Sequence, residues 1–270
     1  MRELLPDKAK LPLPKVRAHM VLHWANLAFV EPLNVGPRFR EYSAFLSPQL
    51  DALLKNNRDG MRQLAAYFLD QGLLAQYEEK YLERLQQLVD TFEFFVPIFG
   101  LRFYQVVSPE LAETKFVTSA SIEDVKQVYI DFFETCAEAL TLVVAFNNLV
   151  VRGDFQSMAD RRRDVVTLDD FRRRSKGDRV AYLTGDEPYD RTFSRLDHRL
   201  RNGLAHNAYV YDARTQDVTY FRSGELNSGD PETFKLMTLM DRCWDLVTGC
   251  KLADELVYQT RKIALVGGEA

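Results

Sequence analysis

Three side chains that can act on a phosphodiester lie within six positions of one another. The segment reads Arg201-Asn202-Gly203-Leu204-Ala205-His206. Arginine carries a permanent, planar cation, and histidine is the side chain that titrates close to neutral pH. A guanidinium, an amide and an imidazole in one short segment can together bind a phosphate and move a proton without a metal ion.

An amphipathic helix from about Asp190 to His206 is expected to carry this segment. Its apolar side chains form one stripe, which we assign to the core: Phe193, Leu196, Leu200 and Leu204. Polar side chains fall on nearly the opposite side: Arg195, Arg199, Asn202 and His206. Arg201 and His206 lie about 140° apart on an ideal helix. They can meet at one phosphate if the helix loosens at Gly203, or if a second copy of the chain supplies partners across a two-fold axis.

Most of the remaining chain is predicted to be helical. Hydrophobic periodicity favours helices over residues 15–30, 59–71 and 73–95, with a proline-punctuated, loop-rich stretch between the first two. Ser121 and Thr167 each begin a capping box, which predicts a long helix through Leu149 and a short basic helix. After His206 the period changes from 3.6 to 2, which predicts a β-hairpin over residues 208–221. Asp230-Pro231-Glu232 is typical of a helix start, so a last helix is expected from there to about Ile263.

Two regions are therefore expected, both mostly α-helical. Residues 1–110 form an N-terminal helical region to which the sequence assigns no role. Residues 111–270 form a helical domain that carries the Arg201–His206 segment and one small β-hairpin after it.

Composition limits the classes of function. The 270-residue chain has a formal net charge of −4 at pH 7, so a nucleic-acid surface has to come from a local basic patch. Its three cysteines form no CxxC pair, which favours buried free thiols in a reducing compartment. Neither a secretory signal nor a membrane span is recognisable, because charges and prolines interrupt the apolar stretches. We therefore expect a cytoplasmic protein with no membrane partner.

Residues 151–206 are locally basic, with thirteen lysines and arginines against ten aspartates and glutamates. This stretch is either a basic surface that binds RNA or a solvated loop whose arginines pair with neighbouring aspartates. Tyr209 offers a ring on which a base can stack. The candidate RNA-binding residues are Arg172, Arg173, Arg174, Arg195, Arg199 and Tyr209.

Metal and cofactor sites have little support. His19 and His23 have the i, i+4 spacing that zinc sites use, but no third ligand is nearby, so packing is favoured. The nucleotide-binding glycine motifs and the GxSxG motif are absent from the sequence. No metal and no cofactor are expected.

Arg201 and His206, separated by four residues and with polar Asn202 after the arginine, resemble the signature of the HEPN superfamily. A long preceding helix and an aromatic-rich extended segment after the signature are also similar, so that the resemblance covers residues 121–265. The bare spacing occurs three more times, at Arg17 to His23, Arg191 to His198 and Arg199 to His206. Asn202, the exact four-residue spacing and the hairpin context distinguish the Arg201 copy from these.

The resemblance implies a helical bundle of HEPN type and metal-independent cleavage of RNA in a homodimer. It also implies a toxin–antitoxin or phage-defence setting, in which an antitoxin or another regulatory protein is a further partner. In that chemistry the ribose 2′-hydroxyl is the nucleophile, His206 moves a proton, Arg201 holds the phosphate, and Asn202 orients one of them.

Two other functions stay open. One is a non-catalytic HEPN-like module that binds RNA, a nucleotide or a protein. The other is a helical scaffold that binds only proteins.

Overall fold

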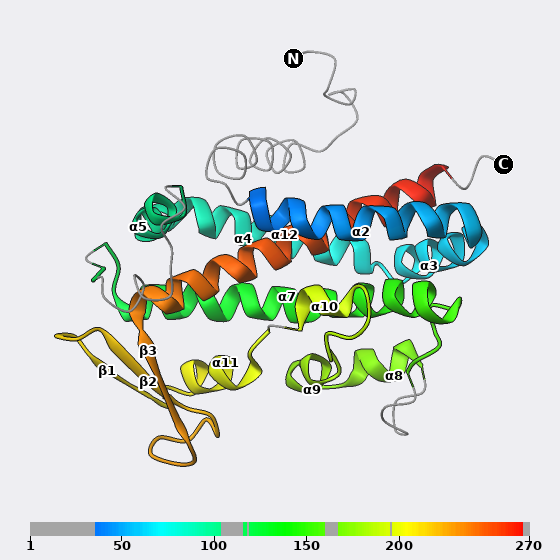
Figure 1. Cartoon of the computed structure of the whole chain (residues 1–270). Helices are drawn as coiled ribbons and strands as arrows, with labels where there is room; N and C mark the ends of the chain where they lie inside the picture. Colours follow the sequence, from blue (N-terminus) through cyan, green and yellow to red (C-terminus); the bar gives the residue numbers. More distant parts are fainter. Residues whose placement is uncertain (1–35, 104–115, 118, 160–166, 195, 267–270) are drawn as a thin grey trace.

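Two long helices lie side by side at the centre of the fold: α7 (Ile122–Arg152) and α12 (Leu236–Val266). The computed structural model describes residues 36–103, 116–117, 119–159, 167–194 and 196–266. Figure 1 shows these parts as a mostly helical protein with one small sheet. The other helices are α2 (Gly36–Asn56), α3 (Arg58–Asp70), α4 (Leu73–Asp90), α5 (Phe92–Phe103), α8 (Leu168–Arg173), α9 (Lys176–Ala181), α10 (Asp190–Phe193) and α11 (His198–Ala205).

The start of α7 is fixed by the predicted capping box. Ser121 Oγ accepts a hydrogen bond from the backbone N–H of Asp124, and the Asp124 carboxylate accepts one from Ser121 N–H. Gly153, in the left-handed conformation with φ of 76°, ends the helix. A second capping box at Thr167 starts α8 in the same way. Both helix starts confirm the sequence prediction, because a cap depends on residues only three positions apart.

The core surrounds α7, which is buried along almost its whole length between Ile122 and Leu149. Helices α3 and α4 pack on the α12 side, whereas α8, α9 and α11 pack along the opposite side of α7 (Figure 1). One hydrophobic cluster joins side chains from α2 through α12. The expected boundary near residue 110 stays a prediction, but helices from both sides of it share this core.

A three-stranded antiparallel sheet follows α11, where one hairpin was expected. Its order is β1 (Tyr209–Asp212), β2 (Asp217–Phe221) and β3 (Pro231–Lys235). The prediction that a helix begins at Asp230-Pro231-Glu232 is wrong, since α12 begins at Leu236. Thr233 pairs with Thr219 through their hydroxyls at 2.8 Å, and Glu232 accepts a hydrogen bond from Tyr220. Pro231 is compatible with this strand because it is the first residue of an edge strand.

Two further helix predictions need correction. The expected helix from Asp190 to His206 is divided into α10 and α11, because Asp197 caps a new helix by accepting hydrogen bonds from the N–H groups of Arg199 and Leu200. Part of the expected loop-rich stretch is instead α2, with Pro48 inside it. Burial of Leu46 and Leu53 against the core outweighs the cost of that proline. The expected helix over residues 15–30, with His19 and His23, lies outside the described residues.

The three cysteines are free and buried, as the sequence predicted. Within the described parts of the chain, no helix combines the length and the apolar character that crossing a bilayer requires.

One buried carboxyl group makes the fold sensitive to pH. The side chain of Asp254 on α12 is only 15% exposed, and burial raises its pKa to about 7. The ammonium group of Lys251, 3.8 Å away, partly opposes this rise, whereas the charges of Glu255 and Glu78 add to it. Between about pH 4 and pH 7 the folded protein therefore keeps a proton on Asp254 that the unfolded chain has released.

We expect Asp254 to lower the free energy of unfolding as the pH rises from about 4 to 7, because over this range the folded state binds more protons than the unfolded state. The Asp254→Asn variant stays neutral, so its stability relative to wild type should increase by on the order of 2 kcal/mol between pH 4.5 and pH 8. Urea unfolding at the two pH values measures this difference. Asp51→Asn, which changes an exposed aspartate on α2, is the control. Equal pH dependence in wild type and Asp254→Asn would contradict the assignment.

Candidate functional site

Helix α11 holds the Arg201–His206 segment tightly between α7 and β2. Leu200 and Leu204 are fully buried. A Cβ atom at Gly203 would lie 2.9 Å from Tyr220 Cδ2 and 3.2 Å from the Phe221 carbonyl oxygen, so only glycine permits this approach to β2. The helix continues through Gly203 without a break. The structure therefore does not show the loosening at Gly203 that would have brought Arg201 and His206 onto one face.

Arg201 points toward α7 and forms an ion pair with Glu134. Its Nη1 also donates a hydrogen bond of 3.0 Å to Asn202 Oδ1. Both charged side chains are mostly shielded from solvent, with 29% of Arg201 and 23% of Glu134 exposed. The guanidinium is thus held in a fixed orientation between a carboxylate and an amide.

His206 ends α11 and is exposed. Its backbone N–H donates to the Asn202 carbonyl oxygen at 3.0 Å, and its side chain makes no hydrogen bond to any described residue. Asn207 then turns the chain with a positive φ of 55°, which is common for asparagine directly after a helix. Asn202 therefore lies between the two reactive groups, in contact with Arg201 through its side chain and with His206 through its backbone.

The loop between β2 and β3 (residues 222–230) lies against Asn202 and His206. A methyl group on Gly224 would be 3.3 Å from His206 Cδ2 and 3.9 Å from Asn202 Cβ. Ser223 folds the loop onto itself, because its hydroxyl contacts the hydroxyl of Ser228 and donates to the Ser228 carbonyl oxygen. Two glycines in this loop were visible in the sequence, but nothing there indicated that the loop reaches His206.

Carboxylates on α7 extend the site beyond Arg201. Glu134 and Glu138, one helical turn apart, both bind Lys176 of α9, and Glu138 also binds Lys80 of α4. Burial alone would raise the pKa of Glu138, but the hydrogen bonds from Lys176 and Lys80 outweigh it and hold the pKa below its usual range. These ion pairs join α4, α9 and α11 to one face of α7.

The contact of Glu134 with Arg201 was not visible in the sequence. The local signal was a pair of carboxylates spaced i, i+4 on α7, and such pairs usually face solvent. The partners of these carboxylates are distant in the sequence. Lys176 follows Glu134 by 42 residues, and Lys80 precedes Glu138 by 58 residues.

The candidate RNA-binding residues do not form one patch. Arg199 is exposed on α11, on the same side as Asn202 and His206. Tyr209 donates a hydrogen bond to Glu123 and accepts one from Lys126 at 3.3 Å, beside the first turn of α7. Burial, followed by the hydrogen bond to Glu123, raises the pKa of Tyr209.

The arginines of α8 have other partners than Arg199 and Tyr209. Arg172 donates to Gln71 of α3, and Arg173 pairs with Asp170 at 2.5 Å. Arg174 is half-buried and its carbonyl oxygen accepts a hydrogen bond from Arg179. Arg195 and the arginines at 161–163 lie outside the described residues.

The arrangement presents a held guanidinium, an amide and a solvent-accessible imidazole along one end of a helix. Within one chain the guanidinium faces α7 and the imidazole faces solvent, so the structure does not bring these two groups onto one face. Among the residues that the structure describes, no three histidine, cysteine or acidic side chains are grouped as metal ligands. The chain matches no protein-family model, no curated protein and no solved structure.

The contact between Gly224 and His206 can be tested with two glycines of the same loop. Gly224 and Gly229 both have positive φ, 80° and 73°, so alanine at either position should cost roughly 1 kcal/mol of stability. Only at Gly224 would the new methyl group press on the imidazole. We expect Gly224→Ala to shift the His206 imidazole signals in NMR spectra of ¹³C-labelled protein, and Gly229→Ala to leave them unchanged. Equal shifts in both variants would show that the loop does not contact His206.

Proposed function

We propose that the protein is a metal-independent endoribonuclease of HEPN type whose active residues are Arg201, Asn202 and His206. The observation that carries the proposal is that Asn202 contacts both other residues, Arg201 through its side chain and His206 through its backbone. The resemblance of the Arg201–His206 segment to the HEPN signature supports the same conclusion from the sequence.

RNA supplies its own nucleophile, the ribose 2′-hydroxyl. In the proposed reaction this oxygen attacks the adjacent phosphorus, and the bond from phosphorus to the 5′-oxygen of the next nucleotide breaks. An imidazole suits either proton transfer, because its ordinary pKa of about 6.5 lies near neutral pH. His206 takes the proton from the 2′-hydroxyl or gives one to the leaving 5′-oxygen. The first product carries a 2′,3′-cyclic phosphate.

Arg201 stabilises the charge that builds on the non-bridging phosphate oxygens. A guanidinium has five N–H donors, and the contacts with Glu134 and Asn202 leave donors for a phosphate. Glu134 acts through Arg201 as a positioning residue, because it fixes the plane of the guanidinium before RNA arrives.

A homodimer is part of the proposal. Within one chain Arg201 faces α7 whereas His206 faces solvent, so one copy presents the two groups to different sides of α11. Two copies related by a two-fold axis can place the imidazole of one beside the guanidinium of the other.

The second candidate function is binding of RNA without cleavage. The ion pair between Arg201 and Glu134 favours it, since a neutralised arginine contributes less to a reacting phosphate than a free one does. Binding that weakens with salt, without cleavage between pH 5 and 9, would distinguish this function.

The cleavage proposal predicts that His206→Ala and Arg201→Ala each lower the rate of RNA cleavage at least about 100-fold, because each removes a group that acts in the transition state. His198→Ala is the matched control: it removes an imidazole from the first turn of the same helix and should keep most of the activity. Cleavage of end-labelled RNA in EDTA, with detection of the cyclic phosphate, gives the rates. Activity that EDTA abolishes, or that both site variants retain, would exclude this mechanism.

Glu134→Gln should lower cleavage about 10-fold or more while the protein stays folded, because a neutral amide holds the Arg201 guanidinium less firmly than a carboxylate does. Glu138→Gln provides the comparison. It removes a neighbouring carboxylate from the same face of α7 but one that binds Lys80 and Lys176 instead of Arg201. Single-turnover rates and thermal melts of both variants separate the two effects. Equal loss of activity in both would mean that Glu134 contributes only to stability.

A further inference from the structure

Two of the three cysteines are in contact inside the core. Cys136 of α7 and Cys250 of α12 place their Sγ atoms 3.1 Å apart, and both side chains are buried. The sulfur atoms of a disulfide are about 2.05 Å apart, so the two thiols need to approach by only about 1 Å to form one. They lie where the two central helices pack against each other.

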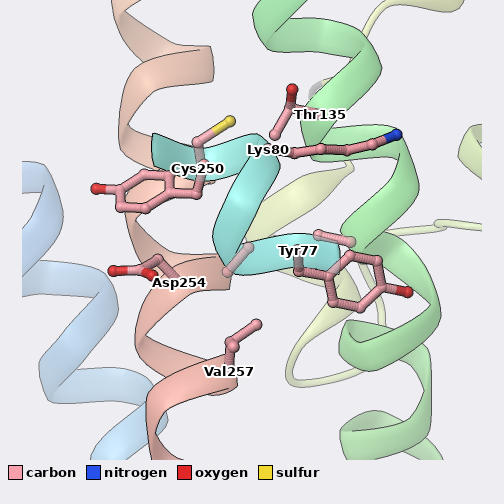
Figure 2. Close-up of a pocket in the computed structure, with 9 residues that line it drawn as sticks. Tyr77, Lys80, Thr135, Cys250, Asp254 and Val257 are labelled. Carbon is pink, nitrogen blue, oxygen red and sulfur yellow. The ribbon is translucent and has the colours of Figure 1, made fainter. Parts of the chain in front are cut away.

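A small cavity reaches Cys250 of this pair. It lies between α4, α7 and α12, and Figure 2 shows its lining by Tyr77, Lys80, Thr135, Cys250, Asp254 and Val257. The space holds about one molecule of the size of water. Hydrogen peroxide is the common cellular oxidant closest to that size, whereas glutathione disulfide and aromatic disulfide reagents are far too large.

We propose that Cys136 and Cys250 form an oxidation site, at which hydrogen peroxide converts the two buried thiols into a reversible disulfide between α7 and α12. First the Cys250 sulfur attacks one peroxide oxygen, the O–O bond breaks, and the thiol proton leaves with the other oxygen as water. Cys250 is then a sulfenic acid. Next the Cys136 sulfur attacks the Cys250 sulfur, an S–S bond forms, the S–O bond breaks and a second water leaves. The two thiols lose two electrons in total, and the peroxide gains them.

The surroundings make this oxidation slow and selective. Burial raises the pKa of the Cys250 thiol, so little reactive thiolate is present at neutral pH. The pair is therefore expected to resist alkylating reagents in the folded protein. Because the partner sulfur is already in contact, a sulfenic acid formed at Cys250 is captured before a second oxidation.

Cys243 is an internal control for the proposal. It is buried on α12, as Cys250 is, but its Sγ contacts the Val125 carbonyl oxygen at 3.7 Å instead of another thiol. A thiol in this setting has no second thiol in contact and is expected to stay reduced.

The experiment treats the folded full-length chain with hydrogen peroxide and then alkylates it in denaturant without reduction. Peptide mapping by mass spectrometry should show the Cys136 and Cys250 peptides joined, one alkylated thiol at Cys243 where three were present before, and return of the two thiols after dithiothreitol. The cross-link joins residues 114 positions apart, so the oxidised protein should melt several degrees higher. Cys243→Ala should form the same cross-link, and Cys136→Ala should form none.

Three outcomes would overturn the proposal: three free thiols after peroxide treatment, a disulfide that includes Cys243 or joins two chains, or sulfinic acid at Cys250 in the wild-type chain. All three outcomes are read from the peptide map of the wild-type protein, so the test holds even if a variant does not fold. None of these readouts involves RNA, so the result is independent of the proposed ribonuclease function.

Discussion

The packing of α7 against α12 is the interaction on which the rest of the structure depends. Each helix has 31 residues, and most side chains of α7 between Ile122 and Leu149 are buried. At roughly 25 cal/mol for each Å² of apolar surface removed from water, a helix with so many buried apolar side chains is a major source of stability. Every other element relevant to the site, α9, α11 and the small sheet included, is positioned by contact with one of these two helices. The packing of these two helices therefore holds the site in place.

Local sequence signals predicted the helical elements well where the signal was itself local. The capping boxes at Ser121 and Thr167 fixed two helix starts, since a cap is decided by side chains three residues apart. Errors arose where tertiary contacts outweighed local preference. Proline suggested a loop over part of α2, and Asp230-Pro231-Glu232 suggested a helix start, but burial of Leu53 and pairing of Thr233 with Thr219 decided both segments.

The candidate site was predictable in its residue types and not in its environment. Arg201, Asn202 and His206 stand close together in the chain, so their motif is visible in one line of sequence. Glu134, which fixes the guanidinium, and Gly224, which lies over the imidazole, come from distant segments that only folding brings to α11. The candidate RNA-binding residues do not form one patch, because Arg172 binds Gln71 at the end of α3 whereas Tyr209 binds Glu123 in the first turn of α7.

The ion pair between Arg201 and Glu134 has a consequence for how strongly salt would affect the binding of a polyanion. A cationic site open to solvent is surrounded by small anions, while RNA carries condensed cations that are set free when its phosphates are neutralised. At Arg201 a carboxylate of the protein itself already serves as the counterion. A phosphate that binds Arg201 would therefore compete with the Glu134 carboxylate, which belongs to the protein and whose local concentration does not depend on the salt in the buffer.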